Sequence, residues 1–156
     1  MIKLLRVDHR LLHGQVAFSW TSALSADCIL IANDDVVTND LRKMSIKLAK
    51  PNGVKLVIKS IKDSIEAINK GVTDKYKLLI VVESIHDAKA LIDGCDCIKS
   101  LNLGGTKASN DKRSISKAVS VTKDEEKILK ELMDKDIEVE IRMIPNEHKL
   151  DAKSVL

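Results

Sequence analysis

The chain has 156 residues, which suits a single domain covering 1–156, and Ile, Leu and Val together supply 48 of those residues. That aliphatic content and a net charge of +3 exclude disorder as the default state, and three aromatic residues are too few for a nucleic-acid stacking platform. No apolar run approaches the roughly 18 residues that span a bilayer, and three cysteines suit neither a disulfide framework nor a zinc site. We therefore expect a cytoplasmic protein with reduced thiols.

Short β-prone runs alternate with helical patterns along the whole chain. The runs cover residues 2–7, 28–32, 54–58, 78–82, 98–103 and 137–141, with a weaker run at 118–121. Several consist almost entirely of Ile, Leu and Val, which is typical of strands covered on both faces in a parallel sheet. The pattern predicts a doubly wound α/β fold with about six or seven mostly parallel strands and helices on both faces.

Hydroxyl residues mark the helix starts between these strands. Ser60, Ser84 and Thr122 each precede an acidic residue by three positions, which is the spacing of a capping box. Gly71 and Gly94 stand where two of these helices should end. We expect residues 33–35 to begin a further helix, with their acids as N-caps rather than as a metal site.

The fold class also predicts where functional residues should lie. Ligands of open α/β sheets bind outside the carboxyl ends of the strands, and here those ends are followed by the segments 8–14, 33–35, 59–60, 83–84 and 104–107. The first of these segments holds two of the four histidines, together with an arginine and an aspartate. It is therefore the strongest candidate for a site.

The residue types of segment 8–14 suit a phosphoryl group carried on histidine. His13 should lie at a helix N-terminus, where free backbone N–H groups favour an anion, and Gly14 lets the backbone approach a ligand closely. Arg10 offers a planar set of donors that matches phosphate oxygens, and Asp8 could orient an imidazole or the arginine. This chemistry predicts nucleophilic phosphoryl transfer through His13.

Other interpretations remain open from the residues alone. The histidines could serve as general acids or bases, or the loop could be purely structural. The basic stretch 107–117 leaves a nucleotide- or nucleic-acid-binding module as a rival, although no G-x-G-x-x-G fingerprint follows the first strand. Trp20 on the first helix is expected to pack in the core or an interface.

Residues 6–16, RVDHRLLHGQV, closely resemble the active-site signature of IIB components of the bacterial sugar phosphotransferase system, mannose/fructose/sorbose family. The resemblance continues at 98–105 (IKSLNLGG), 118–121 and 137–142, and it covers almost the whole chain. It implies a mostly parallel α/β fold. It also implies that a IIA component donates a phosphoryl group to this protein, which passes the group to a sugar transported by the membrane components IIC and IID.

The resemblance implies a role for each residue of the first loop. The phosphorylated histidine maps onto His13, with Nδ1 as the expected acceptor atom, and the signature arginine maps onto Arg10. We expect Asp8 to orient these groups, and Gly14 and Gln15 to supply backbone donors. We further expect Gly104 and Gly105 to line the phosphate site. The covalent phosphohistidine requires no cofactor or metal, no nucleic acid is expected to bind, and a homodimer is possible.

The chain departs from the family pattern at two positions of the site. His9 stands where the family usually has a second acid, and Thr106 follows the glycine pair where methionine is common. Neither departure removes the carrier histidine or its arginine. A regulatory IIB-like protein without a transported sugar is the remaining alternative, and the transported sugar itself is not encoded in any recognisable motif.

Overall fold

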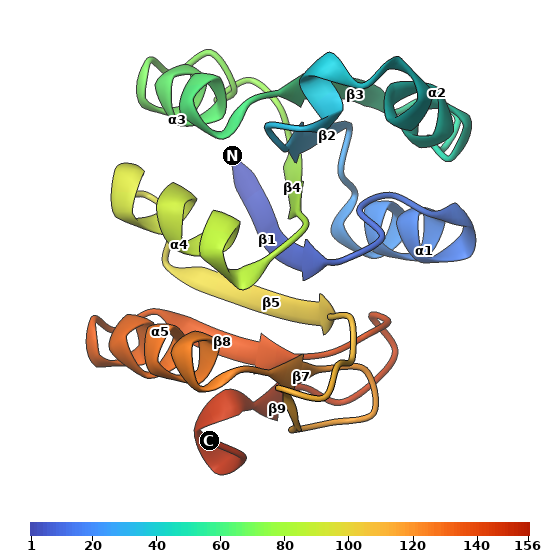
Figure 1. The fold of residues 1–156 in the computed structure, drawn as a ribbon. Coiled ribbons are helices and arrows are strands. Elements are labelled where there is room, and N and C mark those ends of the chain that lie inside the picture. The colour runs from blue at the N-terminus through green and yellow to red at the C-terminus, as the bar shows by residue number, and fades with distance from the viewer.

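The computed structural model describes residues 1–156 and contains a seven-stranded, mostly parallel sheet between two layers of helices (Figure 1). The order across the sheet is β3 (Lys55–Lys59), β2 (Cys28–Ala32), β4 (Leu78–Val82), β1 (Ile2–Asp8), β5 (Ser100–Gly105), β8 (Glu138–Ile141) and β9 (Leu150–Asp151). Only β9 runs antiparallel to its neighbour. The predicted fold class and all six main strands are confirmed.

The weaker predicted run, 118–121, does not join this sheet. Its last two residues form β7 (Ser120–Val121), which pairs with β6 (Arg113–Ser114) in a separate antiparallel hairpin. The strand β9 was not predicted, because two residues in a polar segment carry no alternation or aliphatic run.

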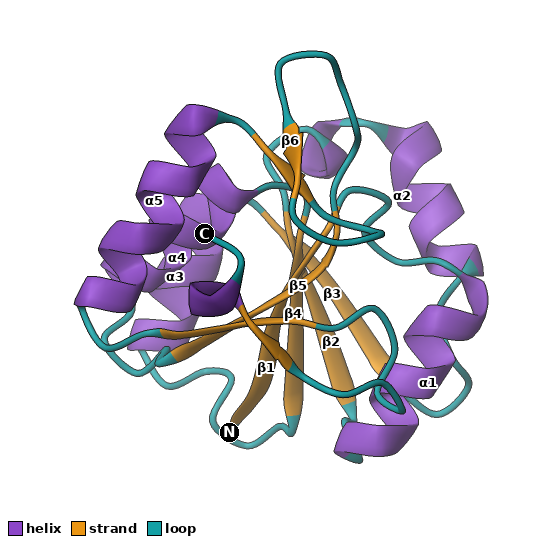
Figure 2. Cartoon of the chain, turned by 90° about the horizontal axis from the view of Figure 1, so that it is seen from below, coloured by secondary structure: helices purple, strands orange, loops and turns teal.

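The helices divide between the two faces of the sheet, as the alternating pattern predicts (Figure 2). One face carries α1 (Gly14–Leu24) and α2 (Asp40–Leu48), and the other carries α3 (Ile61–Asn69), α4 (Ile85–Gly94) and α5 (Lys123–Asp134). Two short 3-10 helices complete the chain, η1 (Val36–Thr38) and η2 (Ala152–Ser154). None of the helices has the length and apolar character needed to cross a membrane.

The predicted helix starts are confirmed by their hydrogen bonds. The hydroxyls of Ser60, Ser84 and Thr122 each accept the backbone N–H three residues on, and Thr122 forms a complete capping box with Glu125. Gly71 follows the end of α3 with a φ of 78°, a left-handed conformation that glycine adopts without strain.

The expectation for segment 33–35 needs correction, because its acids do not cap the helix that follows. Asn33 accepts the N–H groups of Asp35 and Val36, and the N-cap of α2 is Asn39, which accepts from Arg42 N. Asp34 instead accepts the N–H of Ile61, the first residue of α3. The turn before η1 lengthens the connection, so the helix starts later than the sequence pattern indicated.

The direction of winding reverses between β1 and β5, which are neighbours in the sheet. From β1 the chain proceeds through α1 to β2 on one side, whereas from β5 it proceeds to β8 on the other. The two loops therefore diverge and leave room at the carboxyl ends of these strands, which is where ligands of such sheets bind. Asp8 pairs with Gly105 there, after a shift of register in the β1–β5 ladder.

Candidate active site

The loop after β1 is a tight turn fixed by its apolar residues. The carbonyl of Asp8 accepts the N–H of Leu11 over 2.8 Å, and Leu11 has a φ of 58°, which is uncommon for a residue with a branched side chain. Leu11 and Leu12 are buried in the core between the sheet and the α1/α2 layer. Their burial holds the turn in place, so the polar residues of the loop are presented at the sheet edge.

Asp8 is the centre of the site. It is buried at the end of β1, and its Oδ2 lies 3.0 Å from Nε2 of His13 and 3.2 Å from Nη2 of Arg6. Its Oδ1 accepts the backbone N–H of Arg10 over 3.0 Å. One carboxylate thus orients the predicted nucleophile, a buried cation and the backbone of the loop.

His13 is the N-cap of α1, with extended backbone geometry and no side-chain capping bond. Its side chain is 24% exposed, and while Nε2 faces Asp8, Nδ1 makes no hydrogen bond and is not enclosed. The helix that begins at Gly14 has free N–H groups in its first turn, and Gly14 has a φ of 30° with open space around it. The free imidazole nitrogen therefore lies at a helix end that favours anions.

Asp8 is held by a buried hydrogen-bond network that is centred on Arg6. Arg6 donates to Asn102 Oδ1 over 2.8 Å, to Asp8, and to the carbonyls of Arg142 and Met143. Its guanidinium also stacks 5.1 Å from the ring of Trp20, confirming that this tryptophan packs in the core. Burial lowers the pKa of Arg6 from its usual value and the neighbouring Asp8 opposes that change, so the arginine stays a cation.

The two glycines after β5 have different surroundings. A Cβ on Gly104 would lie 2.0 Å from Cζ of Arg6, so this glycine leaves room for the guanidinium. At Gly105 the nearest atom to such a Cβ is Nδ1 of His9 at 3.7 Å, and the Gly105 carbonyl accepts the N–H of His9. Contact of either glycine with a phosphoryl group stays a prediction, but the structure gives Gly104 a steric role that the sequence did not reveal.

The remaining predicted residues lie at the rim of the site. The side chain of Arg10 is 55% exposed, with Nε 3.9 Å from Asp8 Oδ1, and Gln15 is exposed in the first turn of α1. The buried Nδ1 of His9 has no hydrogen-bond partner and lies 4.0 Å from Asp8 Oδ1. His9 and His13 therefore flank opposite oxygens of the same carboxylate.

A polar cleft of about 500 Å³ opens beside His9 at the same edge of the sheet. It is lined by residues that follow β1, β4 and β5 and by the start of α5: His9, Glu83, Ser84, Ile85, Thr106, Lys107, Lys112 and Glu125. The volume is in the range of small-molecule sites. Two members of the predicted basic stretch thus line this cleft, while Arg113 instead pairs with Glu126.

Several residues of the site were not predicted from the sequence. Arg6 lies in β1, Asn102 in β5, and Glu140, which accepts a hydrogen bond from Asn102 Nδ2 over 3.3 Å, in β8. All three fall within the segments that resemble the family, but that resemblance assigned them no role. Their alternation with apolar neighbours on one face of adjacent strands is the only pattern that could have paired them. No cluster of three or more His, Cys, Asp or Glu side chains is arranged to hold a metal ion.

The chain is similar in sequence to known phosphotransferase components. The family model described as the sorbose subfamily IIB component of the phosphotransferase system matches residues 2–156. A probable phosphotransferase enzyme IIB component of Streptococcus pyogenes serotype M6 is 37% identical over 78% of this chain and 74% of its own length. The fructose-specific EIIB component of Bacillus subtilis is 31% identical over 99% of this chain and 95% of its own.

Solved structures show the same fold. The IIB domain of the sorbose permease from Klebsiella pneumoniae superposes with a TM-score of 0.92 at 25% identity, over 99% of this chain and 94% of that one. An N-acetylgalactosamine IIB component from Streptococcus pyogenes gives a TM-score of 0.90 at 26% identity, over 99% and 97% of the two chains. The chain therefore belongs to the sorbose subfamily of IIB components of the phosphotransferase system, and it is a phosphotransferase of sugar uptake.

Proposed function

We propose that His13 is the phosphoryl carrier of this IIB component. It accepts a phosphoryl group from a phosphorylated IIA component and passes it to a sugar taken up through the membrane components IIC and IID. The observation that carries this proposal is the 3.0 Å contact between His13 Nε2 and the buried carboxylate of Asp8, which leaves Nδ1 free at the start of α1. We infer that Nδ1 is the acceptor atom.

The carboxylate fixes the tautomer of the ring. Asp8 accepts a hydrogen bond, so the proton of the neutral imidazole resides on Nε2 and the lone pair on Nδ1. Nδ1 attacks phosphorus as the N–P bond of the donor breaks, and the electron pair of that bond returns to the donor imidazole. The phosphorylated ring keeps its Nε2 proton and gains positive character, which the negative charge of Asp8 stabilises.

In the second transfer His13 is the phosphoryl donor and the sugar is the acceptor. A sugar hydroxyl attacks phosphorus, the Nδ1–P bond breaks with its electron pair returning to Nδ1, and the hydroxyl proton passes to solvent or to a nearby base. The protein's task in both steps is positioning and charge stabilisation. Arg10 and the free N–H groups of Gly14 and Gln15 supply positive potential for the phosphoryl oxygens.

The cysteines are poor alternatives as phosphoryl carriers. Cys28 and Cys95 are buried, and burial raises the pKa of both, in the case of Cys95 to about 11, so neither presents a thiolate. Cys97 is exposed, but it precedes β5 and so lies at the amino end of the strands, away from the site edge. His13 is the free nucleophile at the edge where the loops diverge.

The proposal includes the setting in which the protein works. It would act in the cytoplasm and meet the inner face of the membrane transiently through IIC and IID. The covalent phosphohistidine at His13 serves in place of a dissociable cofactor, and no nucleic-acid partner is required.

The test is incubation with phosphoenolpyruvate, the general phosphotransferase proteins and a IIA component, followed by intact-mass measurement. We expect one acid-labile phosphoryl group, which is abolished by His13→Ala and largely retained in His9→Ala and Cys97→Ser. A label that survives His13→Ala but disappears in either of the other variants contradicts the proposal. A labelled protein that phosphorylates no sugar with IIC and IID present would be a regulatory relative.

A further inference from the structure

The outer face of α2 carries an unusual group of exposed apolar side chains. Leu41, Met44 and Leu48 are 75%, 61% and 83% exposed, and they account for three of the seven large hydrophobic residues that the molecule leaves exposed. Their spacing of three and four residues places them in one row along the helix. Ile46 anchors the opposite side of α2 in the core, so this row, the α2 ridge, points away from the protein.

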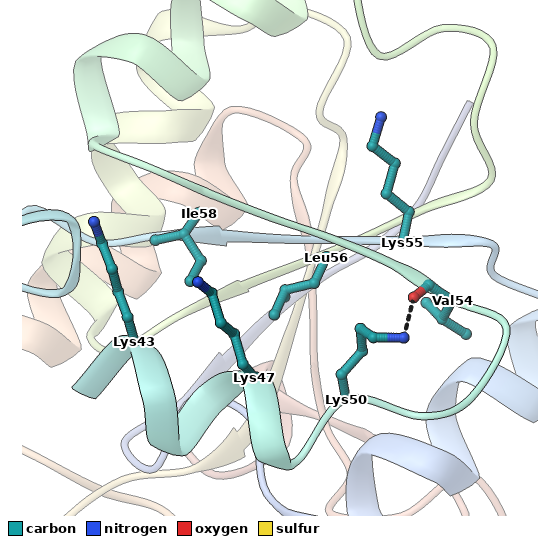
Figure 3. A pocket seen from close by; sticks show the side chains of 7 residues that line it. All are labelled: Lys43, Lys47, Lys50, Val54, Lys55, Leu56 and Ile58. Carbon is teal, nitrogen blue, oxygen red and sulfur yellow. Dashed lines mark hydrogen bonds between the residues drawn. The ribbon is translucent and has the colours of Figure 1, made fainter. Parts of the chain in front are cut away.

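Between α2 and the edge strand β3 lies a groove of about 640 Å³ (Figure 3). Its floor is formed by Val54, Leu56 and Ile58. The side chains of Lys43 and Lys47 extend from α2 toward this floor, and Lys50 and Lys55 complete the lining of the groove. The groove thus has an apolar floor and a cationic rim.

The positive charge here is free to meet an anion. Lys50 donates to the carbonyls of Pro51 and Val54, whereas Lys43 and Lys47 take part in no ion pair. The segment 40–50 contains four basic residues and one acid, Asp40, which lies in the first turn of α2. Lysines beside an apolar ridge favour an anionic, partly apolar partner.

The charge disfavours a second copy of this chain, because pairing α2 with its own equivalent would place the lysines of both copies together. The α2 ridge also projects from the surface, since its side chains are 61–83% exposed. A projecting apolar row flanked by lysines is the arrangement by which amphipathic helices enter the boundary between lipid headgroups and acyl chains. Acidic lipid headgroups would satisfy the ammonium groups.

We propose that the α2 ridge and the lysine-rimmed groove form a docking surface for a bilayer that contains anionic phospholipid. The contact is peripheral and reversible, because three apolar side chains and two free lysines supply modest binding. The two helices α1 and α2 cover the same face of the sheet, so α1, whose N-cap is His13, belongs to the layer held toward the lipid (Figure 2). The layer of α3, α4 and α5 then faces away from the membrane.

The test measures sedimentation of the purified full chain with vesicles of phosphatidylcholine alone or of equal parts phosphatidylcholine and phosphatidylglycerol. We expect binding to the anionic vesicles only, and its loss in high salt. Lys43→Gln with Lys47→Gln should weaken partitioning roughly 30-fold at low salt, from the usual worth of a lysine near an anionic surface. Leu41→Gln with Leu48→Gln should weaken it as well.

The matched control is Lys123→Gln with Lys127→Gln, two exposed lysines at the same spacing on α5, on the opposite face of the sheet. The control should lower binding much less than the α2 pair. Equal effects of the two lysine pairs, equal binding to neutral vesicles, or no binding would each overturn the proposal, as would a concentration-dependent dimer that the α2 variants dissociate. Phosphorylation of His13 is measured without vesicles. The result of the vesicle experiment is therefore independent of the test of the proposed function.

Discussion

The substitution Gly104→Ala tests whether the polar network beneath the site is as closely packed as the structure shows. The added methyl group would lie 2.0 Å from Cζ of Arg6 and 2.2–2.3 Å from both Nη atoms. Ordinary van der Waals contact begins near 3.4 Å, so the guanidinium would have to move by about 1.4 Å. Because Arg6 is buried between Trp20 and the backbone, there is no empty space into which the guanidinium could move.

The cost follows from the hydrogen bonds that such a shift breaks. Arg6 donates four, at 2.8–3.2 Å, to Asn102, Asp8 and two carbonyls of the loop after β8, and a movement of that size cannot keep all four at bonding distance and angle. Disrupting a buried charge pair typically costs 3–5 kcal/mol, and we expect Gly104→Ala to lower the free energy of unfolding by about that amount. Since domains are stable by 5–15 kcal/mol, much of the stability would be lost.

Urea unfolding monitored by fluorescence measures this loss, because Trp20 is the only tryptophan and stacks on Arg6. Gly105→Ala is the matched control: its methyl group would meet nothing closer than 3.7 Å, and its stability should stay within about 1 kcal/mol of the parent. In the Arg6→Ala background, Gly104→Ala should cost little more, giving a strongly non-additive cycle. Equal stabilities for Gly104→Ala and Gly105→Ala would refute the steric reasoning.

Three further predictions concern the site and its surroundings. Arg10→Ala should slow phosphorylation of His13 roughly 10²–10³-fold while leaving urea stability within about 0.5 kcal/mol, since the side chain is mostly exposed. Asp8→Asn should slow it roughly 10²–10⁴-fold by losing control of the tautomer, and an unchanged rate in quench-flow labelling would exclude that role. Burial, and then Asp34 and Glu83, raise the pKa of Asp87. Its ionisation therefore destabilises the fold as pH rises above about 4, and Asp87→Asn should gain stability relative to the parent between pH 3.5 and 7 in urea titrations; a constant difference contradicts this.

The sheet could be predicted from the sequence because its central strands are covered on both faces. Strands such as β2 and β4 then consist of continuous aliphatic residues, a signal that does not depend on the rest of the fold. The edge element β9 and the hairpin of β6 and β7 have two residues per strand, and backbone pairing with a neighbour defines them. Such elements have no sequence signal of their own.

The sequence predicted which loop forms the site, but not the buried hydrogen-bond network that supports this loop. Segment 8–14 was predicted as the site because polar residues cluster there after an apolar strand, and the structure places Arg10 and His13 around the carboxylate of Asp8. Arg6 and Asn102 could not be predicted as partners, because 96 residues separate them and only the pairing of β1 with β5 brings them together. The proposed role of Gly104 was incomplete for the same reason.

Burying the charged pair of Arg6 and Asp8 costs free energy, and the position of the pair beside His13 explains why it is nevertheless present. Charges removed from water are not a favourable way to stabilise a core, and apolar residues of similar volume usually do as well. Here, however, the carboxylate must remain ionised and stationary, because a neutral or rotating Asp8 would no longer hold the Nε2 proton of His13. A guanidinium held by Asn102, two carbonyls and Trp20 fixes the position of the carboxylate and places a positive charge 3.2 Å from it. It follows that substitutions of Arg6 should impair phosphoryl transfer even where the fold survives, because the orientation of the proposed nucleophile, His13, depends on Asp8 and on the buried cation that holds it.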